Sequence, residues 1–482
     1  MTQKTGGLLA RVLAAFPAGP NSYPVRNPAT GSVIAQVANV GNAQAVTEAV
    51  ERAALVHPHN SADRKAMLAR WYSLFLLHID DLAHIATLES GKPLAEAKGE
   101  VQYAASYIKY YADLEIAGKT IISPHSLNKT RLWTVKQPVG PCALITPWNF
   151  PYAMAVRKIS PAIAAGNACI LKPAPETPLS AFAMKLLAND AGIPDDAFQI
   201  LSADRQNAVD VVGKVLMADT RIRKVSFTGS TNAGISLMQQ AATTMKKASM
   251  ELGGNAPLII FEDADLNQAV DGCMFGKFRN AGQACIAVNR IYIHSKIHNE
   301  FVSKLAEKIK ILRVGDGLNN KTTVGPLITK TSVDRVAALV SSSLESGAQL
   351  VFQSSLSNEL QASGGYFYPP TLLTNVTDDM EIFKTEIFGP VAAVSTFDTE
   401  EDVVRRANDT PFGLAAYLFT NDIARLHRVA ENLEAGMVGL NECAISAAVA
   451  PFGGVKMSGI GREGSSEGIE EYLETKYLCL AV

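Results

Sequence analysis

Residues 224–237 read KVSFTGSTNAGISL, and this stretch predicts a β-strand that passes directly into an α-helix. Residues 225–228 are rich in β-branched and aromatic side chains, Gly229-Ser230 is a turn, and the residues from Thr231 onward have a helical pattern. A strand followed at once by a helix is the repeating unit of a parallel sheet covered by helices. The stretch therefore predicts an α/β fold.

The same alternation continues on both sides of this stretch. Upstream, the apolar runs PCALITP (141–147) and ACILKPA (168–174) alternate with alanine-rich helical patterns such as AVRKISPAIAAG (155–166). Downstream, the apolar runs APLIIFE (256–262) and RIYIHS (290–295) are separated by another helical pattern. Repeated strand–helix alternation favours parallel sheets with helices on their faces.

Three outlying segments complete this prediction. Residues 43–118 carry apolar side chains at helical spacing and predict a helical region. The apolar run 8–16 is interrupted by Arg11 and followed by Pro17, which indicates a short amphipathic helix rather than a signal peptide. The tail, EEYLETKYLCLAV (470–482), alternates like an edge strand.

Size and charge narrow the class of protein. The chain has 482 residues, 48% of them hydrophobic, which is too long for one small core and predicts two or three domains. Its 44 basic and 46 acidic residues nearly balance, so no strong field attracts nucleic acid or an anionic membrane. No stretch approaches the roughly 20 apolar residues of a membrane span. The expected partners are small molecules and further copies of the chain.

The cysteines indicate a compartment. The six cysteines form no CxxC pair and no recognisable disulfide framework. Sparse, unpaired cysteines are typical of a reducing environment, so we expect the cytoplasm. No metal site is expected.

One cysteine stands apart from the others. Cys285 lies in the polar stretch FRNAGQACIAVNR (278–290), whereas a structural cysteine normally has apolar neighbours. The loop precedes another element, and backbone N–H groups there would lower the pKa of the thiol. For an isolated cysteine, a structural role is still the commoner explanation. None of the eight histidines lies in a motif-like setting, which disfavours a Cys–His protease.

A glutamate is the best candidate for a base. Glu251 lies in SMELGGNAPLI (249–259), where Gly253 and Gly254 allow a substrate or another backbone to come close. A partly buried carboxylate there would have a raised pKa and serve as a general base, although a capping or loop acid is equally compatible. Residues 464–468 match the GxSxG pattern of serine hydrolases, but no strand precedes them and no histidine follows.

Two motifs suit a nucleotide. The strand–glycine–helix junction at Gly229-Ser230 presents free backbone N–H groups to a phosphate, but many strand–helix turns also contain glycine. Lys172, in ILKPAPETP (170–178), ends an apolar strand and would reach cofactor hydroxyls, or else be a solvated loop residue.

Taken together, seven motifs resemble the aldehyde dehydrogenase superfamily from nearly one end of the chain to the other. They are TPWNFP (146–151), LKPA (171–174), SFTGS (226–230), ELGGNAP (251–257), FRNAGQAC (278–285), EIFGP (386–390) and PFGGVKMSGIGREG (451–464). Within the superfamily, LESGKPLAEAKGEVQYAASY (88–107) is similar to the succinate-semialdehyde dehydrogenase branch, including its bacterial glutarate-semialdehyde relatives.

The resemblance implies a mechanism. Cys285 attacks the aldehyde and forms a thiohemiacetal, whose oxyanion accepts from the Asn149 side-chain amide and the Cys285 backbone N–H. Hydride passes to the nicotinamide, and water activated by Glu251 hydrolyses the thioester to the acid.

The resemblance also implies a cofactor site. It places Lys172 on the adenosine ribose, Gly229 and Ser230 at the pyrophosphate with Trp148 nearby, Glu386 on the nicotinamide ribose and Phe388 beside the ring. NAD-preferring relatives usually carry a glutamate three positions after the lysine, where this chain has Pro175, followed by Glu176. This departure predicts that the enzyme accepts NADP as well as NAD, with NADP slightly favoured.

Two arginines suggest the substrate. Arg157 lies eight residues after Asn149, so in one helix the two would share a face, and Arg279 lies six residues before Cys285. Guanidinium groups pair with carboxylates, although arginines in helices usually pair with structural acids. Succinate-semialdehyde dehydrogenases carry arginines at both positions and a serine matching Ser446, so the resemblance implies a short ω-oxo acid. The alternatives are an enzyme for aromatic or aliphatic aldehydes, or a non-catalytic protein.

The resemblance implies three structural parts. They are a Rossmann-like cofactor domain (1–120 and 141–252), an α/β catalytic domain (253–450) and a small bridging or oligomerisation sheet (121–140 and 451–482). The edge strand in the tail suggests a homodimer or homotetramer. Some members of this branch have a second cysteine two residues after the nucleophile, where this chain has Ala287, so we expect no disulfide switch there.

Overall fold

The first sheet of the computed structural model is built around the stretch from which the fold was predicted. The structure describes residues 7–19, 21–117, 120–121 and 130–481. The strand at 224–228 runs into α10 (Thr231–Ala242), which confirms the predicted strand–turn–helix. In the order in which the strands lie, the sheet contains β19 (Gly459–Ile460), β9 (Lys247–Glu251), β8 (Lys224–Thr228), β5 (Cys142–Ile145), β6 (Cys169–Lys172) and β7 (Phe198–Ile200). Every pairing except that of β19 is parallel.

The helices that pack around this sheet come from the segment before β5 and from between the strands. The predicted helical region between 43 and 118 is confirmed and consists of α2 (Ala43–Ala54), α3 (Ser61–Leu77), α4 (Ile79–Ser90) and α5 (Leu94–Asp113). Between the strands lie α6 (Pro151–Ala165), α7 (Pro178–Asp190), α8 (Arg205–Asn207) and α9 (Lys214–Ala218). Every residue of α6 is buried, so this helix is the centre of the first core.

Two buried glutamates fix the starts of the central helices. The Glu100 carboxylate accepts from the backbone N–H groups of Tyr152 (2.8 Å) and Ala153 (3.3 Å) in the first turn of α6. Glu89 accepts from two N–H groups at the start of α7. Free N–H groups at a helix start need such partners and favour a negative charge. Because Asn149 comes just before α6, Glu100 also helps to fix its position.

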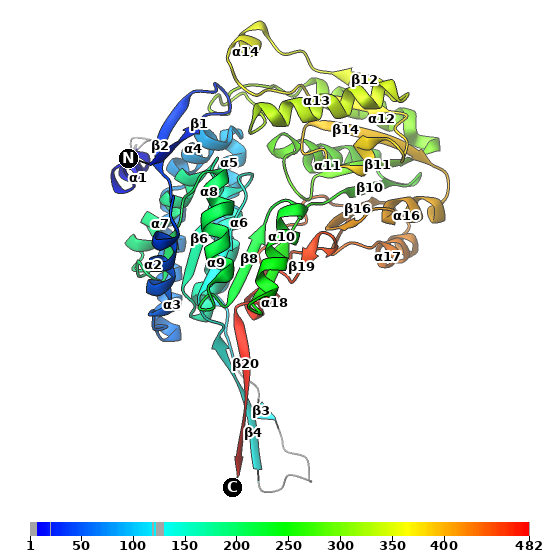
Figure 1. Cartoon of the computed structure of the whole chain (residues 1–482). Coiled ribbons are helices and arrows are strands. Elements are labelled where there is room, and N and C mark those ends of the chain that lie inside the picture. Colours follow the sequence, from blue (N-terminus) through cyan, green and yellow to red (C-terminus); the bar gives the residue numbers. More distant parts are fainter. Residues whose placement is uncertain (1–6, 20, 118–119, 122–129, 482) are drawn as a thin grey trace.

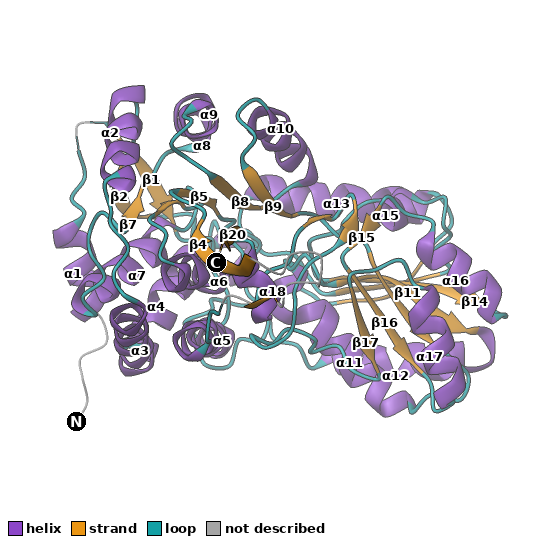
Figure 2. Cartoon of the chain, turned by 90° about the horizontal axis from the view of Figure 1, so that it is seen from below, coloured by secondary structure: helices purple, strands orange, loops and turns teal. Residues whose placement is uncertain are grey.

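A second, larger sheet lies beside the first (Figure 1). In spatial order it contains β12 (Gln349–Gln353), β13 (Thr371–Thr374), β14 (Val391–Phe397), β11 (Val288–His294), β10 (Ala256–Ile260), β16 (Ala415–Phe419) and β17 (Met437–Leu440). All its pairings are parallel except that of β12, as the sequence predicts for a helix-covered sheet. Its main helices are α11 (Leu266–Phe278), α12 (His298–Lys310), α13 (Lys330–Glu345), α16 (Glu400–Asn408) and α17 (Ile423–Asn432). Figure 2 shows the same two halves from below.

The C-terminal tail forms a narrow arm that projects below the first sheet (Figure 1). Here β20 (Leu473–Ala481) pairs antiparallel with β4 (Thr130–Pro138), which also pairs with β3 (Thr120–Ile121). In this three-stranded sheet β20 is an edge, which confirms the prediction for the tail. Part of the predicted bridging segment, residues 122–129, lies outside the described residues.

Short elements complete the chain. They are α1 (Gly7–Ala15), β1 (Ser22–Arg26), β2 (Val33–Ala38), α14 (Asn358–Ala362), α15 (Glu381–Lys384), β15 (Phe412–Gly413), β18 (Val455–Lys456) and α18 (Ser465–Glu470). Helix α1 confirms the predicted N-terminal helix. The glycine-rich segment before residue 464 contains β18 and β19, so it is not wholly a loop as expected, but neither strand leads directly into the GxSxG-like pattern. Among the described residues, no helix is long and apolar enough to cross a membrane.

Candidate active site

The predicted cofactor residues of the first sheet follow the carboxyl ends of its parallel strands. Trp148 and Asn149 follow β5, Lys172 ends β6, Gly229 follows β8 and Glu251 ends β9. The chain continues from β5 to β6 and β7 on one side, and then to β8 and β9 on the other. Ligands of open α/β sheets bind outside the carboxyl ends where the strand order reverses, which here is between β5 and β8.

The second sheet contributes residues from the amino ends of its strands. Only residues 252–255 separate β9 from β10, and Cys285 comes shortly before β11. A Cβ atom on Gly254 would lie 2.4 Å from the backbone oxygen of Cys285, so only glycine allows the two backbones this close. The close approach predicted from the paired glycines is therefore confirmed, and the backbone that approaches is that of the nucleophile.

The loop that carries Cys285 has an unusual backbone. Asn280, Ala281 and Gly282 have φ angles of 51°, 54° and 74°, and Ala281 is buried in this left-handed conformation. Left-handed backbone is costly for alanine and persists only where the surroundings impose it. Gln283 supplies part of that constraint, because its side chain accepts from Ile328 N (3.0 Å) and donates to Asn280 O (3.0 Å). The loop is thus held rigidly just before the nucleophile.

The pKa of the Cys285 thiol differs from the lowered value predicted from sequence. The pKa of Cys285 is raised to about 12, mainly by burial; the Glu386 and Glu251 carboxylates also raise it, and the Arg157 charge lowers it. The predicted lowering by backbone N–H groups is a minor effect, so the prediction of a lowered pKa is wrong for this state of the protein. A protonated thiol needs a base before it can attack.

Glu251 has the properties of that base. Its side chain is 2% exposed, and neither carboxyl oxygen has a hydrogen-bond partner among the residues that the structure describes. Burial and the nearby Glu463 raise its pKa well above the ordinary value, as the sequence predicts for a general base. A Cβ atom on Gly453 would lie 2.9 Å from Glu251 Oε1, so that glycine makes room for the carboxyl group. Both oxygens remain free to accept a proton.

A second carboxyl group lies nearby, and its pKa is shifted in the opposite direction. Glu463 accepts from Arg157 Nε (2.6 Å) and from Lys158 Nζ. Burial would raise the pKa of Glu463, but the two cations outweigh it and the pKa is lowered. Environments that push two acids apart in pKa are typical of active sites. The role of Glu463 was not assigned from sequence, although it lies within the GREG part of a recognised motif.

Asn149 lies against the catalytic loop. Its Nδ2 donates to Gln283 O (3.1 Å), and its backbone oxygen accepts from Lys92 Nζ (2.6 Å) and Asn280 Nδ2 (3.0 Å). Lys92 also pairs with the buried Glu100. Because α6 begins at Pro151, Asn149 precedes the helix, so the prediction that it shares a helical face with Arg157 is wrong. Lys92, which sequence reasoning missed, holds the residue that should bind the oxyanion.

The residues proposed for the cofactor form a set that fits a dinucleotide. Trp148 and Phe388 meet edge to face, with ring centroids 5.6 Å apart. Ser230 makes no side-chain cap, so the start of α10 keeps free N–H groups for a phosphate. Burial lowers the pKa of Lys172 to about 8, and burial raises that of Glu386 to about 7. Glu386 Oε1 accepts from Gly254 N (3.2 Å), which ties Glu386 to the segment between β9 and β10.

A cavity of about 520 Å³ reaches Cys285, the candidate nucleophile. Its lining includes Cys285 and the three residues proposed to bind substrate, Arg157, Arg279 and Ser446. Arg157 also forms the ion pair with Glu463. It therefore pairs with a structural acid and lines the cavity at the same time. The Arg279 guanidinium lies over the rings of Phe150 (5.2 Å) and Phe275 (4.9 Å), and no ion pair to it is present among the described residues.

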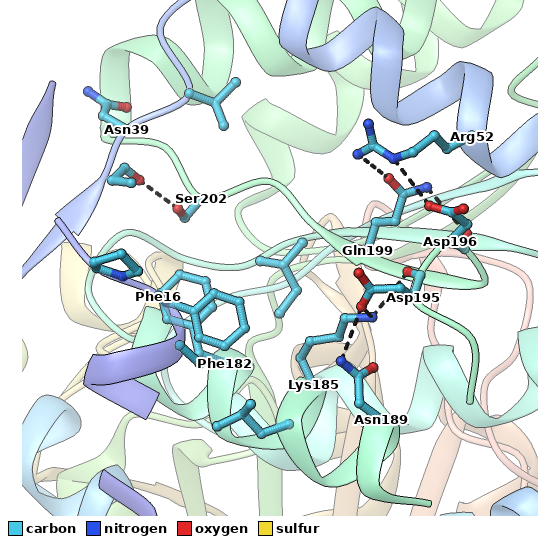
Figure 3. A pocket seen from close by; sticks show the side chains of 16 residues that line it. Phe16, Asn39, Arg52, Phe182, Lys185, Asn189, Asp195, Asp196, Gln199 and Ser202 are labelled. Carbon is cyan, nitrogen blue, oxygen red and sulfur yellow. Dashed lines mark hydrogen bonds and ion pairs between the residues drawn. The ribbon is translucent and has the colours of Figure 1, made fainter. Parts of the chain in front are cut away.

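A surface cavity of about 580 Å³ lies elsewhere, between α1 and α7 (Figure 3). Its charged groups satisfy one another, since Lys185 pairs with Asp195 (2.7 Å) and Arg52 with Asp196 (3.2 Å). The stacked rings of Phe16 and Phe182 close one side. None of the residues proposed for catalysis lines it, so it does not contribute to the site.

Comparison with known proteins agrees with this site. Residues 16–478 match the model of the aldehyde dehydrogenase family, and the chain belongs to that family. It is 46% identical to the Escherichia coli succinate-semialdehyde dehydrogenase [NADP(+)], over 95% of this chain and 94% of the relative. It is 47% identical to a 3-sulfolactaldehyde dehydrogenase of Pseudomonas putida, over 95% and 93% of the two chains. A crystal structure of succinate-semialdehyde dehydrogenase from Burkholderia pseudomallei is similar, with a TM-score of 0.92, 46% identity and coverage of 96% and 95%.

Proposed function

We propose that the protein oxidises a short aldehyde with an anionic tail, succinate semialdehyde or glutarate semialdehyde, to the carboxylic acid with NADP or NAD. The observation that carries this proposal is the pair of arginines in the cavity of Cys285. Arg157 Nη1 has no hydrogen-bond partner among the described residues, and Arg279, which forms no ion pair among them, lines the same cavity. Free guanidinium donors suit a carboxylate. The relatives named for succinate semialdehyde and for 3-sulfolactaldehyde act on aldehydes with an anionic group, which supports the same class here.

The residues divide the chemistry among themselves. Glu251 accepts the thiol proton, and Cys285 Sγ attacks the aldehyde carbon. The oxyanion of the thiohemiacetal accepts hydrogen bonds from Asn149 Nδ2 and Cys285 N, donors worth about 10²–10³-fold each in comparable sites. When bound, NAD(P)⁺ supplies a hydride acceptor. Glu251 then releases the proton of the thiol to solvent, takes a proton from water as the water oxygen attacks the thioester, and returns that proton to the leaving sulfur, which frees the acid and the Cys285 thiol.

Replacing Arg279 by alanine tests the substrate class. We expect the KM for succinate semialdehyde to rise about 10- to 100-fold, because a bond to a charged group is lost, while the KM for butanal stays within about twofold. Steady-state kinetics on both aldehydes measure this. Arg405→Ala, an exposed arginine on α16, is the matched control. If the wild-type enzyme prefers butanal or benzaldehyde, or if Arg279→Ala affects both aldehydes equally, the proposal fails.

A second variant tests the cofactor. Glu176, which follows the Pro175 departure, pairs with Arg205 (3.2 Å), whose side chain is 84% exposed and free to meet a further anion. Arg205 offsets the repulsion between Glu176 and a 2′-phosphate, so Arg205→Ala should weaken NADP binding about five- to tenfold and leave NAD within about twofold. Quenching of tryptophan fluorescence by each cofactor measures the Kd of the resting enzyme. Equal effects on both cofactors contradict the role of Arg205.

Assembly and domain organisation stay predictions. We infer a homodimer or homotetramer, because β20 forms a sheet edge suited to pairing with another copy. We infer the cytoplasm from the sparse cysteines, which form no recognisable disulfide framework. The proposed domains are a cofactor domain (1–120 and 141–252), a catalytic domain (253–450) and a bridging part (121–140 and 451–482). This division rests on the resemblance to the aldehyde dehydrogenase superfamily.

A further inference from the structure

Two tyrosines of α5 form a hydrogen-bonded pair beside the cavity of Cys285. Tyr103 and Tyr107 are one helical turn apart, their hydroxyl oxygens are 2.7 Å apart, and their rings meet edge to face at 5.1 Å. Tyr103 lines the cavity, whereas Tyr107 is fully buried behind it. Neither residue has a role in the chemistry described above.

The Tyr107 ring lies beside the inner arginine. The Arg157 guanidinium carbon is 6.0 Å from the Tyr107 ring centroid and 4.0 Å from that of Phe452. Burial raises the pKa of Tyr107 well above its ordinary value, so its hydroxyl stays protonated. A hydroxyl near a fixed cation turns its oxygen toward the charge and its hydrogen away. With its oxygen toward Arg157, Tyr107 has its hydrogen available for Tyr103, and the Tyr103 hydrogen is then available to a ligand in the cavity.

One nitrogen of the Arg157 guanidinium is left for a ligand. Its Nε is bonded to Glu463 (2.6 Å) and its Nη2 to Met154 Sδ (3.2 Å), whereas Nη1 is buried with no partner among the described residues. An unpaired buried donor on a charged group is unfavourable unless a ligand satisfies it. Arg157 and Cys285 line the same cavity, and the Arg157 charge lowers the pKa of the Cys285 thiol.

We propose that Arg157 Nη1 and the Tyr103 hydroxyl together receive the anionic end of the aldehyde, and that Tyr107 is a positioning residue that directs the Tyr103 donor toward it. This inference rests on the proposed function, since it assumes an anionic tail. Its ligand is a carboxylate or another oxyanion of a short chain, for which the Tyr103 hydroxyl adds a neutral donor to the two arginines of the proposed function. Two donors at fixed positions favour an anion over a neutral end of the same size.

Three tyrosine-to-phenylalanine variants test the proposal on the full enzyme. Tyr103→Phe should raise the KM for succinate semialdehyde about 10- to 100-fold, with kcat and the KM for butanal within about twofold. Tyr107→Phe should raise the same KM about three- to tenfold. The double variant should be no worse than Tyr103→Phe alone, because Tyr107 acts only through Tyr103. Tyr110→Phe, on the same helix and outside the cavity lining, is the control and should change nothing.

Each contrary result has a distinct meaning. If wild-type enzyme does not prefer succinate semialdehyde over butanal, the proposed function and this inference both fail. If the preference is present but Tyr103→Phe leaves the KM for succinate semialdehyde unchanged, or raises both KM values equally, this inference alone fails. If the effects of the two single variants multiply in the double variant, Tyr107 does not act through Tyr103. Thermal unfolding of each variant shows whether α5 is intact, and Tyr103→Phe decides the case if Tyr107→Phe does not fold.

Discussion

Glu251→Gln should lower aldehyde oxidation at pH 7 by about 10²–10⁴-fold, the usual contribution of a general base. The amide has nearly the shape of the carboxyl group but accepts no proton. Because burial raises the pKa of Cys285 to about 12, the thiol of this variant stays protonated at neutral pH. Attack on the aldehyde and hydrolysis of the thioester should both become slow.

The pH dependence separates this role from a structural one. The pKa of Glu251 is raised, so its basic form is scarce at low pH, and wild-type activity should rise with pH until that pKa is passed. In Glu251→Gln, activity should instead rise about tenfold per pH unit, following the thiolate fraction of Cys285, whose pKa burial still raises. Steady-state rates across the pH range in which the protein stays folded measure both profiles. A variant that keeps the wild-type profile would exclude Glu251 as the base.

Asn149→Ala should lower kcat/KM by about 10²–10³-fold at every pH, because the loss is a hydrogen-bond donor to the oxyanion and not a proton acceptor. Asn149 Nδ2 donates to Gln283 O at 3.1 Å, close to the nucleophile, and its second hydrogen is available. Lys92 and Asn280 hold its backbone oxygen and do not depend on the side chain. The loop should therefore keep its shape in the variant.

Alkylation of Cys285 by iodoacetamide provides the control for Asn149→Ala. This reaction needs a thiolate but forms no oxyanion, so Asn149→Ala should leave its rate within about twofold, whereas Glu251→Gln should slow it at pH 7. If Asn149→Ala slows alkylation as much as aldehyde oxidation, the residue supports the loop and does not bind the oxyanion.

Much of the site could be predicted from local sequence. The junction of β8 and α10 follows from a β-branched run, a glycine turn and a helical pattern within residues 224–237. The paired glycines after Glu251 predicted a close backbone approach, which Gly254 makes to Cys285. These features depend on neighbouring residues only, and the backbone rules that govern them hold in any fold.

Long-range packing decided the rest. Arg157 and Glu463 are 306 positions apart in the chain, so their ion pair and the free Nη1 cannot be seen in either local sequence. Lys92 reaches Asn149 across 57 positions, and the start of α6 at Pro151 was two residues later than the helical-face argument needed. Both outcomes depend on which side chains are brought together in the folded core.

Cys285 shows most clearly which properties local sequence determines and which depend on the folded structure. The sequence alone indicated Cys285 as the candidate nucleophile, from its residue type, its polar loop and the family motifs. Its protonation state did not follow from them, since backbone N–H groups suggested a lowered pKa and burial raises it. Sequence motifs specify which chemical groups are present and how the local backbone bends. The pKa, the partner and the free donor of each group depend on desolvation and on charges that only the packed chain brings close.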